Sequence, residues 1–250
     1  MRYAILSDIH GNGTALKAAL EDVGRHGIKH ILCLGNIVGV GPDPVECVDT
    51  VRTTCFLTLL GHHDYAIVQK PVNVTAAVER ALTWSRAAIE SGDPEQAAQR
   101  WTFLQKLNER YDKNGLTFVH GSPRDPVSEY VFPEDCERNQ RKIVESFEMF
   151  EKVLFIGNNH VPGVFREDLT FTPAIELEHY FHYRKGEKVM ISVGSVGLPR
   201  DGDPRACWIE INKNEMTWHR IQYDVESVAA RVEAEQELPS VYARRLREAF

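Results

Sequence analysis

Short apolar stretches alternate with polar loops along most of the chain. Each stretch has the length and the β-branched content of a buried strand, and each ends abruptly in a loop rich in Gly, Asp, Asn or His. Such stretches lie at residues 4–6, 31–34, 56–60, 116–119, 153–156 and 189–193. The pattern predicts short strands that open at one end into loops whose side chains can bind a ligand.

Helical periodicity fills the gaps between the first strands. Leu16 and Leu20 fall on one face of a helix expected at residues 14–26, with Thr14 as its N-cap, and a shorter helix is expected at 43–53. The early order is therefore β-α-β-α-β, and we expect helices to cover both faces of the sheet.

The second half of the chain changes to apolar and polar positions in strict alternation, which is typical of antiparallel hairpins. Strands are expected at 164–172, 175–183, 206–212 and 215–222, with Lys213 and Asn214 forming the last turn. The fold class predicted from these elements is α/β (α+β).

Two helical segments look like additions to this core. Residues 73–110 form a polar insertion whose apolar stripe consists of Trp84, Trp101, Phe103 and Leu104. We expect the two tryptophans to pack against the core rather than to form a lid over a substrate. Residues 224–250 predict a charged C-terminal helix. Because neither segment has the composition of a linker, we expect residues 1–250 to form one domain.

Composition limits the classes of function. The chain has 250 residues, of which 43% are hydrophobic and 26% charged, and this is ordinary for a globular protein. The net charge of −7 argues against binding to nucleic acid or to an anionic membrane. No apolar run approaches the length of about 18 residues that a membrane span needs.

The cysteines indicate a cellular compartment. There are five, an odd number without metal-binding spacing, and most lie inside apolar runs: Cys33, Cys47, Cys55, Cys136 and Cys207. We expect buried free thiols in a reducing compartment. The chain also passes from Met1 and Arg2 directly into a strand-like run without a leader-like apolar segment, so we expect a cytoplasmic protein.

Polar side chains recur where the predicted strands end. If these strand ends face one way, one rim of the sheets carries Asp8, His10, Asn36, His62, His63, His120, Asn158 and His160. An Asp-x-His step offers a hard oxygen and an imidazole nitrogen to one divalent ion. One such step is a weak signal, whereas its recurrence at several strand ends predicts a metal site. The remaining histidines, His26, His30, His179, His182 and His219, are expected to be structural or exposed.

The motifs at these strand ends carry a family resemblance over residues 1–223. They read DIHGN at 8–12, GNIVGVGP at 35–42, GHHD at 61–64, HGSP at 120–123, GNNHVP at 157–162 and GSVGLPR at 194–200. The set resembles the calcineurin-like metallophosphoesterase superfamily, in particular its small bacterial branch of phosphodiesterase-like proteins. The resemblance implies a four-layer αββα sandwich with a helical insertion, in which a hydroxide bridging two metal ions attacks phosphorus.

The resemblance also implies residue roles. One metal site would consist of Asp8, His10, residue 36 and His160. The other would consist of residue 36, residue 62, His120 and residue 158. His63 would protonate the leaving group or stabilise the transition state, oriented by Asp64, while Asn12 and Arg200 would contact phosphate oxygens. An ordinary loop residue or ion-pair partner remains an equal alternative for Arg200.

Three of these positions depart from the family pattern. Asn36 stands where the family has a bridging Asp, His62 where it has Asn, and Asn158 where it has the first His of its last motif. The amide and imidazole have exchanged places between 62 and 158, which we interpret as compensation. The amide of Asn36 can lend a carbonyl oxygen but cannot offset the repulsion between two cations. We therefore predict one firmly bound divalent ion (Mn, Fe, Zn or Ni) and a second that is weak, altered in preference, or bound only with substrate.

Three functions remain in competition. The first is a metal-dependent phosphoesterase that hydrolyses a phosphodiester or phosphomonoester through a metal-activated hydroxide, acting on a small phosphorylated substrate. The second is a catalytically weak phosphate- or nucleotide-binding protein on the same scaffold. A nuclease is disfavoured by the acidic balance and by the lack of a basic tract.

Overall fold

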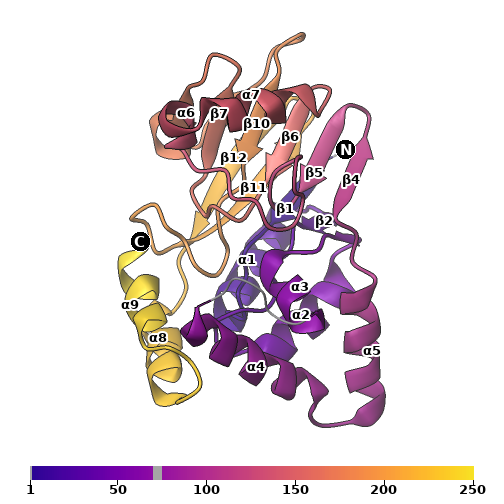
Figure 1. Cartoon of the computed structure of the whole chain (residues 1–250), viewed down its shortest axis with the longest axis vertical. Helices are drawn as coiled ribbons and strands as arrows, with labels where there is room; N and C mark the ends of the chain where they lie inside the picture. Colours follow the sequence, from indigo (N-terminus) through magenta and orange to yellow (C-terminus); the bar gives the residue numbers. More distant parts are fainter. Residues whose placement is uncertain (1, 70–74) are drawn as a thin grey trace.

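A computed structural model describes residues 2–69 and 75–250. Two six-stranded sheets lie face to face, and helices cover the outer face of each, so the chain forms the αββα sandwich that the sequence predicts (Figure 1). The first two residues of the predicted insertion, 73 and 74, lie outside the described residues.

The first sheet contains three parallel strands from the start of the chain and three antiparallel strands from its second half. Its order is β3-β2-β1-β11-β12-β9. The strands are β1 (Arg2–Leu6), β2 (His30–Cys33), β3 (Leu57–Thr58), β9 (Tyr180–His182), β11 (Ala206–Asn212) and β12 (Glu215–Ile221). Because β1, β2 and β3 are parallel, their carboxyl ends meet at one edge of the sandwich.

The second sheet has the order β4-β5-β6-β10-β7-β8. Its strands are β4 (Arg110–Lys113), β5 (Leu116–Val119), β6 (Val153–Ile156), β7 (Gly163–Arg166), β8 (Phe171–Pro173) and β10 (Val189–Ser192). Here β5, β6 and β10 are parallel, so three more strands end together in loops. All six strands that the sequence predicted to end in polar loops belong to these two parallel sets.

Burial of apolar side chains accounts for the layers. Between the sheets, a core cluster includes Ile5, Phe118, Phe155, Ile191 and Ile209, contributed by both sheets. A second cluster joins the outer face of the first sheet to helices, and a third does the same for the second sheet. Neighbouring residues of one strand therefore serve different layers, as the alternation of side chains in a strand requires.

Helices α1 (Gly13–Arg25) and α2 (Pro44–Thr54) cover the first sheet, and α6 (Asp135–Arg138) and α7 (Gln140–Glu148) cover the second. Helix α1 begins at Gly13 because the side chain of Asn12, and not that of Thr14, caps it by accepting from the backbone N–H of Ala15. The expected N-cap was therefore wrong by two residues. Helix α2 begins at Pro44, whose fixed φ suits the first helical position.

The predicted insertion contains α4 (Ala76–Glu90) and α5 (Pro94–Gln105), which follow α3 (His62–Val68). Trp101 packs against the core cluster of the first sheet, and Trp84 packs against a cluster shared with the C-terminal segment. Both tryptophans thus pack against the core, as we expected.

The C-terminal segment is two helices rather than one. Helix α8 (Val225–Ala234) and helix α9 (Val241–Glu248) flank a break that contains Pro239. Their apolar faces pack with Val40 and Leu198, which belong to two of the loops at the strand ends. The pair of helices therefore lies against these loops (Figure 1).

Two of the predicted hairpin strands are shorter than expected. The predicted strand 164–172 is interrupted, because Leu169 adopts φ +65° and the Asp168 carboxylate accepts hydrogen bonds from Thr170. The predicted strand 175–183 begins as a 3-10 turn, Ala174–Leu177, and is a strand only in the short β9. Strand β3 likewise covers only two of the residues expected at 56–60.

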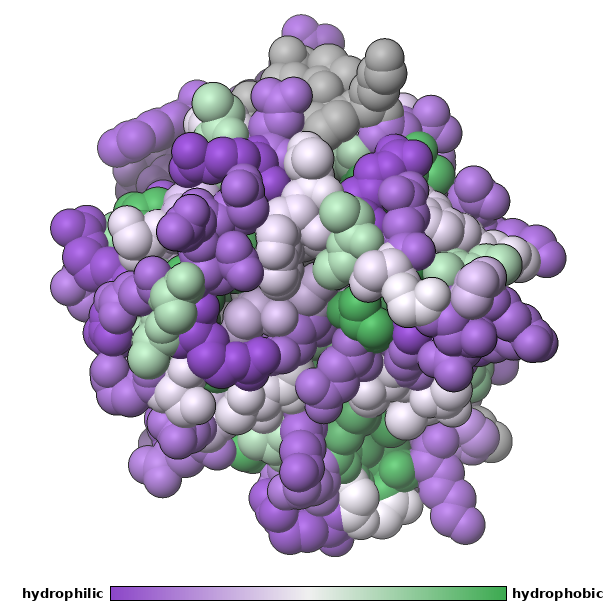
Figure 2. All heavy atoms as spheres, turned by 90° about the horizontal axis from the view of Figure 1, so that it is seen from below, coloured by the Kyte–Doolittle hydropathy of each residue, from purple (hydrophilic) through white to green (hydrophobic). Residues whose placement is uncertain are grey.

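Surface character agrees with the composition. On the face seen in Figure 2, hydrophilic residues predominate, and hydrophobic residues form small separate areas. Within residues 2–69 and 75–250, every helix is too short or too polar to cross a bilayer.

Candidate metal centre

The backbone at the strand ends adopts an unusual conformation. Left-handed φ values between 53° and 64° occur at Asp8, His10, Asn36, Asn158 and His160, all predicted site residues. Residues with a Cβ rarely adopt this conformation, and it tends to persist where a site requires it. The left-handed turns aim successive side chains inward from loops that lie far apart in the sequence.

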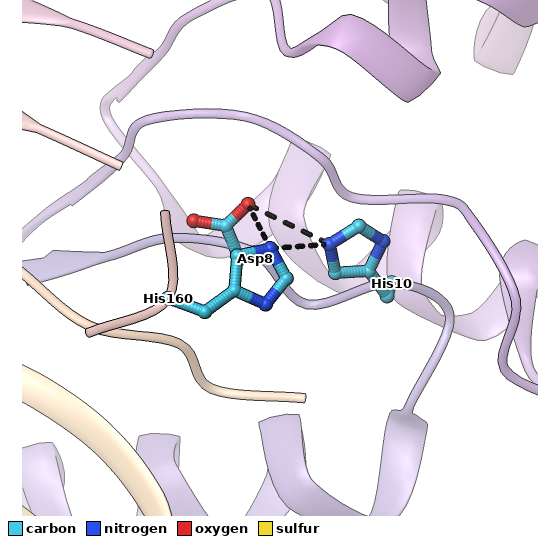
Figure 3. Close-up of side chains that lie close together, drawn as sticks. All are labelled: Asp8, His10 and His160. Carbon is cyan, nitrogen blue, oxygen red and sulfur yellow. Dashed lines mark hydrogen bonds and ion pairs between the residues drawn. The ribbon is translucent and has the colours of Figure 1, made fainter. Parts of the chain in front are cut away.

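Three side chains meet at one point (Figure 3). Asp8 Oδ1 lies 3.2 Å from His160 Nε2 and 3.5 Å from His10 Nε2, and the two imidazole nitrogens lie 3.2 Å apart. Asp8 and His10 follow β1 of the first sheet, whereas His160 follows β6 of the second. The predicted convergence of these three side chains is therefore present, across 150 residues of sequence.

The protonation of His160 follows from its contacts. Its Nδ1 lies 2.5 Å from the carbonyl oxygen of Leu198, so Nδ1 carries the hydrogen and Nε2 presents a lone pair. Burial lowers the pKa of His160, and it lowers that of His10 to about 3, so both rings are neutral near pH 7. Two buried nitrogens facing each other at 3.2 Å without an added proton suit a shared cation.

The donor set fits a divalent transition metal. Donors bound at 2.0–2.2 Å around one ion are separated by about 3.0–3.5 Å, which matches the spacing of these three atoms. Burial alone would raise the pKa of Asp8, but His160 and His120 hold it well below its usual range, so the carboxylate is ionised. Its second oxygen is already fixed by Ser7 Oγ at 2.7 Å and by the N–H of Asn158 at 2.9 Å. Only Oδ1 is therefore directed at the two imidazoles.

Asn36 does not present its oxygen to this point. Its Oδ1 accepts from the backbone N–H of His63 at 2.8 Å, and its Nδ2 donates to Asp8 Oδ1 at 3.0 Å. The orientation of an amide is assigned from its partners, and a backbone N–H can only donate. The carbonyl oxygen that the sequence suggested as a replacement ligand is therefore already engaged, and an N–H group occupies the side facing Asp8.

In the predicted second set of ligands, His120 and Asn158 are buried, His62 is half-buried, and several of their polar atoms lack partners within the described chain. His120 Nε2 lies 3.9 Å from Asp8 Oδ1, and burial lowers the pKa of His120 to about 4. Among the described residues, no hydrogen bond reaches either ring nitrogen of His120, either side-chain polar atom of Asn158, or Nδ1 of His62. Buried polar atoms are nearly always paired. This group therefore suits a cation too, although it supplies no carboxylate of its own.

His63 and Asp64 stand at the start of α3. The His63 ring meets the His10 ring edge-on, with centroids 4.7 Å apart, and burial holds its pKa well below the usual value. Asp64 accepts from the backbone N–H groups of Ile37 at 2.9 Å, Val38 at 3.1 Å and Gly61 at 3.2 Å. This carboxylate ties together the loops that carry Asn36 and His63, and the expectation that it orients the His63 ring stays a prediction.

Asn12 has a structural role. Its amide oxygen caps α1, and its amide nitrogen donates to the carbonyl of Gly197 at 3.0 Å and to Tyr223 Oη at 3.3 Å. Both ends of this buried amide are engaged within the protein, and the contact with phosphate that the family resemblance implied stays a prediction. The sequence does not distinguish a helix cap from a phosphate contact at Asn12, because an Asn just before a helix is compatible with either role.

Unlike Asn12, Arg200 has a buried side-chain atom that is free to bind a ligand within the described chain. Burial lowers the pKa of its guanidinium, and its charge in turn contributes to lowering the pKa values of His10 and His160. Its buried Nε has no hydrogen-bond partner among residues 2–69 and 75–250. A cation close to the imidazoles, with a buried Nε that lacks a partner among the described residues, suits an anion at the metal centre.

Several supporting residues escaped sequence reasoning. Ser195 Oγ donates to the backbone carbonyl of Asp8 and accepts from the N–H of Leu198, the residue that holds His160. Tyr130 lies beside the His62 ring, with centroids 6.4 Å apart. The Gly-Ser motif at 194–195 offered a signal for Ser195, whereas nothing in the sequence around Tyr130 marks it.

Comparisons with known proteins agree with this geometry. A family model described as a calcineurin-like phosphoesterase superfamily domain matches residues 1–214. An uncharacterized protein of Methanocaldococcus jannaschii is 30% identical over 254 residues, which cover 97% of this chain and 96% of that protein.

Two solved structures have a similar fold. A metallophosphoesterase from Sphaerobacter thermophilus superposes with a TM-score of 0.82 at 30% identity, over 100% of this chain and 99% of that one. A hypothetical protein from Pyrococcus horikoshii OT3 gives a TM-score of 0.74 at 19% identity, over 98% and 97% of the two chains. The second likeness concerns the fold alone.

Proposed function

The chain belongs to the calcineurin-like phosphoesterase superfamily, and we propose that it hydrolyses a small phosphodiester or phosphomonoester with a divalent transition metal held by Asp8, His10 and His160. The observation that carries the proposal is the approach of three buried donor atoms to within 3.2–3.5 Å of one another. Mn, Fe, Zn and Ni all accept such a mixed nitrogen and oxygen set.

The bound ion supplies a Lewis acid that neutralises phosphoryl oxygens and lowers the pKa of water to about 7. The chain's own residues prepare its place. Ser7 and Asn158 fix Asp8, while Leu198 fixes the His160 ring, so two ligands are held before an ion arrives. Such support raises the affinity for the ion, because side chains that are already fixed lose little conformational freedom when the ion binds.

We further propose that a second ion binds weakly or only with substrate. Donor atoms come from His62, His120 and Asn158, but Asn36 offers no negative charge to offset the repulsion between two cations. A phosphate oxygen from the substrate would provide the missing negative charge. This supports a centre whose second ion arrives together with the ligand.

His63 is the proposed catalytic side chain outside the ligand set. Its lowered pKa leaves the ring neutral near pH 7, and the low pKa disfavours an imidazolium acid. A neutral imidazole still donates one N–H, which suits stabilisation of a developing negative charge. Of the two roles implied by the family resemblance, transition-state stabilisation is therefore better supported.

Arg200 is proposed to bind a phosphoryl oxygen, because its guanidinium lies near the two imidazoles and its buried Nε lacks a partner within the described chain. The acidic net charge favours a small substrate attracted locally over a nucleic acid. Four of the five free cysteines are buried, which supports the predicted cytoplasmic location.

The alternative is a phosphate- or nucleotide-binding protein with little turnover, and the hydrogen bond from Asn36 to Asp8 is the observation in its favour. An assay with bis-(p-nitrophenyl) phosphate and added Mn²⁺ separates the two. Hydrolysis that is lost in both His63→Ala and His160→Ala supports the enzyme. Tight binding of phosphate without turnover in the unaltered protein supports the alternative and overturns the hydrolase.

A further inference from the structure

A second group of possible ligands lies on the other side of the first sheet. Asp22 and His26 belong to the C-terminal end of α1, and Glu210 and His219 belong to β11 and β12 beneath it. Glu210 shares its side of β11 with Trp208, which packs in the cluster between α1 and the sheet. The group is therefore part of the outer layer, separated by the sheet from the core between the sheets.

The four side chains approach one another closely. One atom each from Asp22, His26 and His219 lies within 4.8 Å of the other two. Glu210 Oε2 lies 3.5 Å from His219 Nε2 and 3.9 Å from His26 Nδ1, and Asp22 Oδ2 lies 3.8 Å from His26 Nε2. The two contacts of His26 use opposite ring nitrogens, Nε2 toward Asp22 and Nδ1 toward Glu210, so one ion can be shared by Asp22, His26 and His219 while Glu210 lies beside it.

Each carboxylate has one oxygen committed elsewhere and one turned toward the histidines. Arg25 pairs with Asp22 Oδ1 at 2.9 Å, and Arg2 pairs with Glu210 Oε1 at 2.6 Å. Both arginine side chains are well exposed, at 63% and 41%, so water screens their charge. Asp22 Oδ2 and Glu210 Oε2 remain as the oxygens that face the imidazoles.

The surroundings resemble the support that metal ligands usually receive. Trp208 Nε1 donates to Asp22 Oδ2 at 3.1 Å, and its ring stacks on the His219 ring, with centroids 4.1 Å apart. His219 Nε2 is buried, and the carboxylate oxygen facing it is Glu210 Oε2 at 3.5 Å.

We propose that Asp22, His26 and His219, with Glu210 beside them, form a second metal site that binds a divalent ion such as Zn²⁺, Ni²⁺ or Co²⁺. Two imidazoles with one or two carboxylates suit these ions and disfavour Mg²⁺, which prefers oxygen ligands. The site has a structural role, because it joins the end of α1 to β11 and β12 and lies apart from the proposed catalytic residues. It does not depend on the proposed function.

The test compares the unaltered full chain with three variants, each stripped of metal and then dialysed against Zn²⁺. The variant His26→Ala/His219→Ala removes two ligands of the new site, and His10→Ala/His160→Ala removes two ligands of the catalytic centre. His182→Ala serves as the matched control, since His182 is an exposed histidine of the same sheet. Bound zinc per chain and the shift of the melting midpoint with Zn²⁺ are measured for all.

We expect His26→Ala/His219→Ala to lose one equivalent of zinc and at least about tenfold in affinity, while phosphoesterase activity is unchanged. His10→Ala/His160→Ala should keep that equivalent, so failure of the catalytic proposal would leave this one standing. Equal zinc content and equal midpoint shifts in the unaltered protein and in His26→Ala/His219→Ala would overturn the site. Should the double variant fold poorly, His26→Ala alone decides the question, because His26 is half-exposed at the end of α1.

Discussion

Asn36 Nδ2 donates a hydrogen bond to Asp8 Oδ1 at 3.0 Å, at the position where the family pattern has a metal-bridging carboxylate. The bond supplies locally what a second cation would supply, a positive partner for the buried Asp8 oxygen. Unlike a carboxylate, the neutral Asn36 amide adds no negative charge that a second cation would have to offset. Its oxygen is held by the backbone N–H of His63. This contact supports the proposal that the centre holds one ion firmly.

Asn36→Asp should change both metal content and stability. Without metal, two buried carboxylates would face each other, and we expect a loss of about 3 kcal/mol in the free energy of unfolding. With Mn²⁺ in excess, the new carboxylate should raise the bound metal from one equivalent to about two and increase hydrolysis. Urea unfolding with and without chelator, and metal analysis, measure the two effects.

Asn36→Ala is the matched control, since it removes the amide without adding charge. It should lose the Asp8 contact but gain no metal. If Asn36→Asp binds the same single equivalent as the unaltered protein at saturating Mn²⁺, the account of Asn36 given above is wrong.

His160→Ala and His120→Ala should separate the two sets of ligands. His160 belongs to the triad that lies within 3.2–3.5 Å, so its loss should remove the bound ion and reduce activity by at least about 100-fold. His120 lies 3.9 Å from Asp8 Oδ1 in the weaker set. His120→Ala should therefore keep most of the metal that is bound without substrate. It should lose activity mainly because the second ion, which binds together with the substrate, is held more weakly. Equal loss of metal in both variants would contradict this order of affinity.

Much of the fold and of the triad could be predicted from sequence, because strand length and strand-end motifs are local signals. The approach of Asp8 and His160 to 3.2 Å is not local, because the two residues follow strands of different sheets. It follows once the parallel strands of both sheets end at the same edge of the sandwich. What could not be predicted is how an amide or carboxylate divides its hydrogen bonds. Asn12, Asn36 and Asp64 all bond to backbone groups whose positions only the folded loops define.

Arg200→Lys should weaken substrate binding more than it changes metal content. Lysine keeps the charge but loses the two-pronged donor geometry that suits a phosphoryl group, so we expect KM to rise about tenfold. Arg184→Lys, at an exposed arginine, is the control and should leave KM unchanged. Steady-state kinetics with the same chromogenic diester measures both. An unchanged KM in Arg200→Lys would assign Arg200 to an ordinary loop role.

Asp64→Asn should destabilise the protein although it does not remove a metal ligand. An amide would place an NH₂ group against at least one of the three backbone N–H groups that Asp64 now accepts from. We expect a loss of about 1–3 kcal/mol in the free energy of unfolding, measured by urea denaturation. Asp168→Asn is the control, because Asp168 is exposed in a turn where an amide oxygen serves as well. Its effect should stay within about 0.5 kcal/mol, and a similarly small effect in Asp64→Asn would refute the structural role.

Gly39→Ala tests whether the two rings at the centre depend on close backbone approach. A Cβ at Gly39 would lie 2.4 Å from His10 Nδ1 and 2.9 Å from His63 Nδ1, closer than real Cβ contacts allow. Neither ring can yield freely, since both are buried among the other site residues. The added methyl group should therefore displace His10 from the ion and weaken metal binding by at least about tenfold.

Gly24→Ala is the matched control for that change. Gly24 lies inside α1, and a Cβ there would meet nothing within 4 Å. Alanine should stabilise the helix by about 0.5–1 kcal/mol and leave metal affinity unaltered. Titration of both stripped variants with Mn²⁺, followed calorimetrically, compares them directly. The two substitutions add the same methyl group at different places. Weaker metal binding in Gly39→Ala alone would therefore trace the effect to the position of the His10 ring. Equal affinities in the two variants would show instead that metal binding does not depend on the position of that ring.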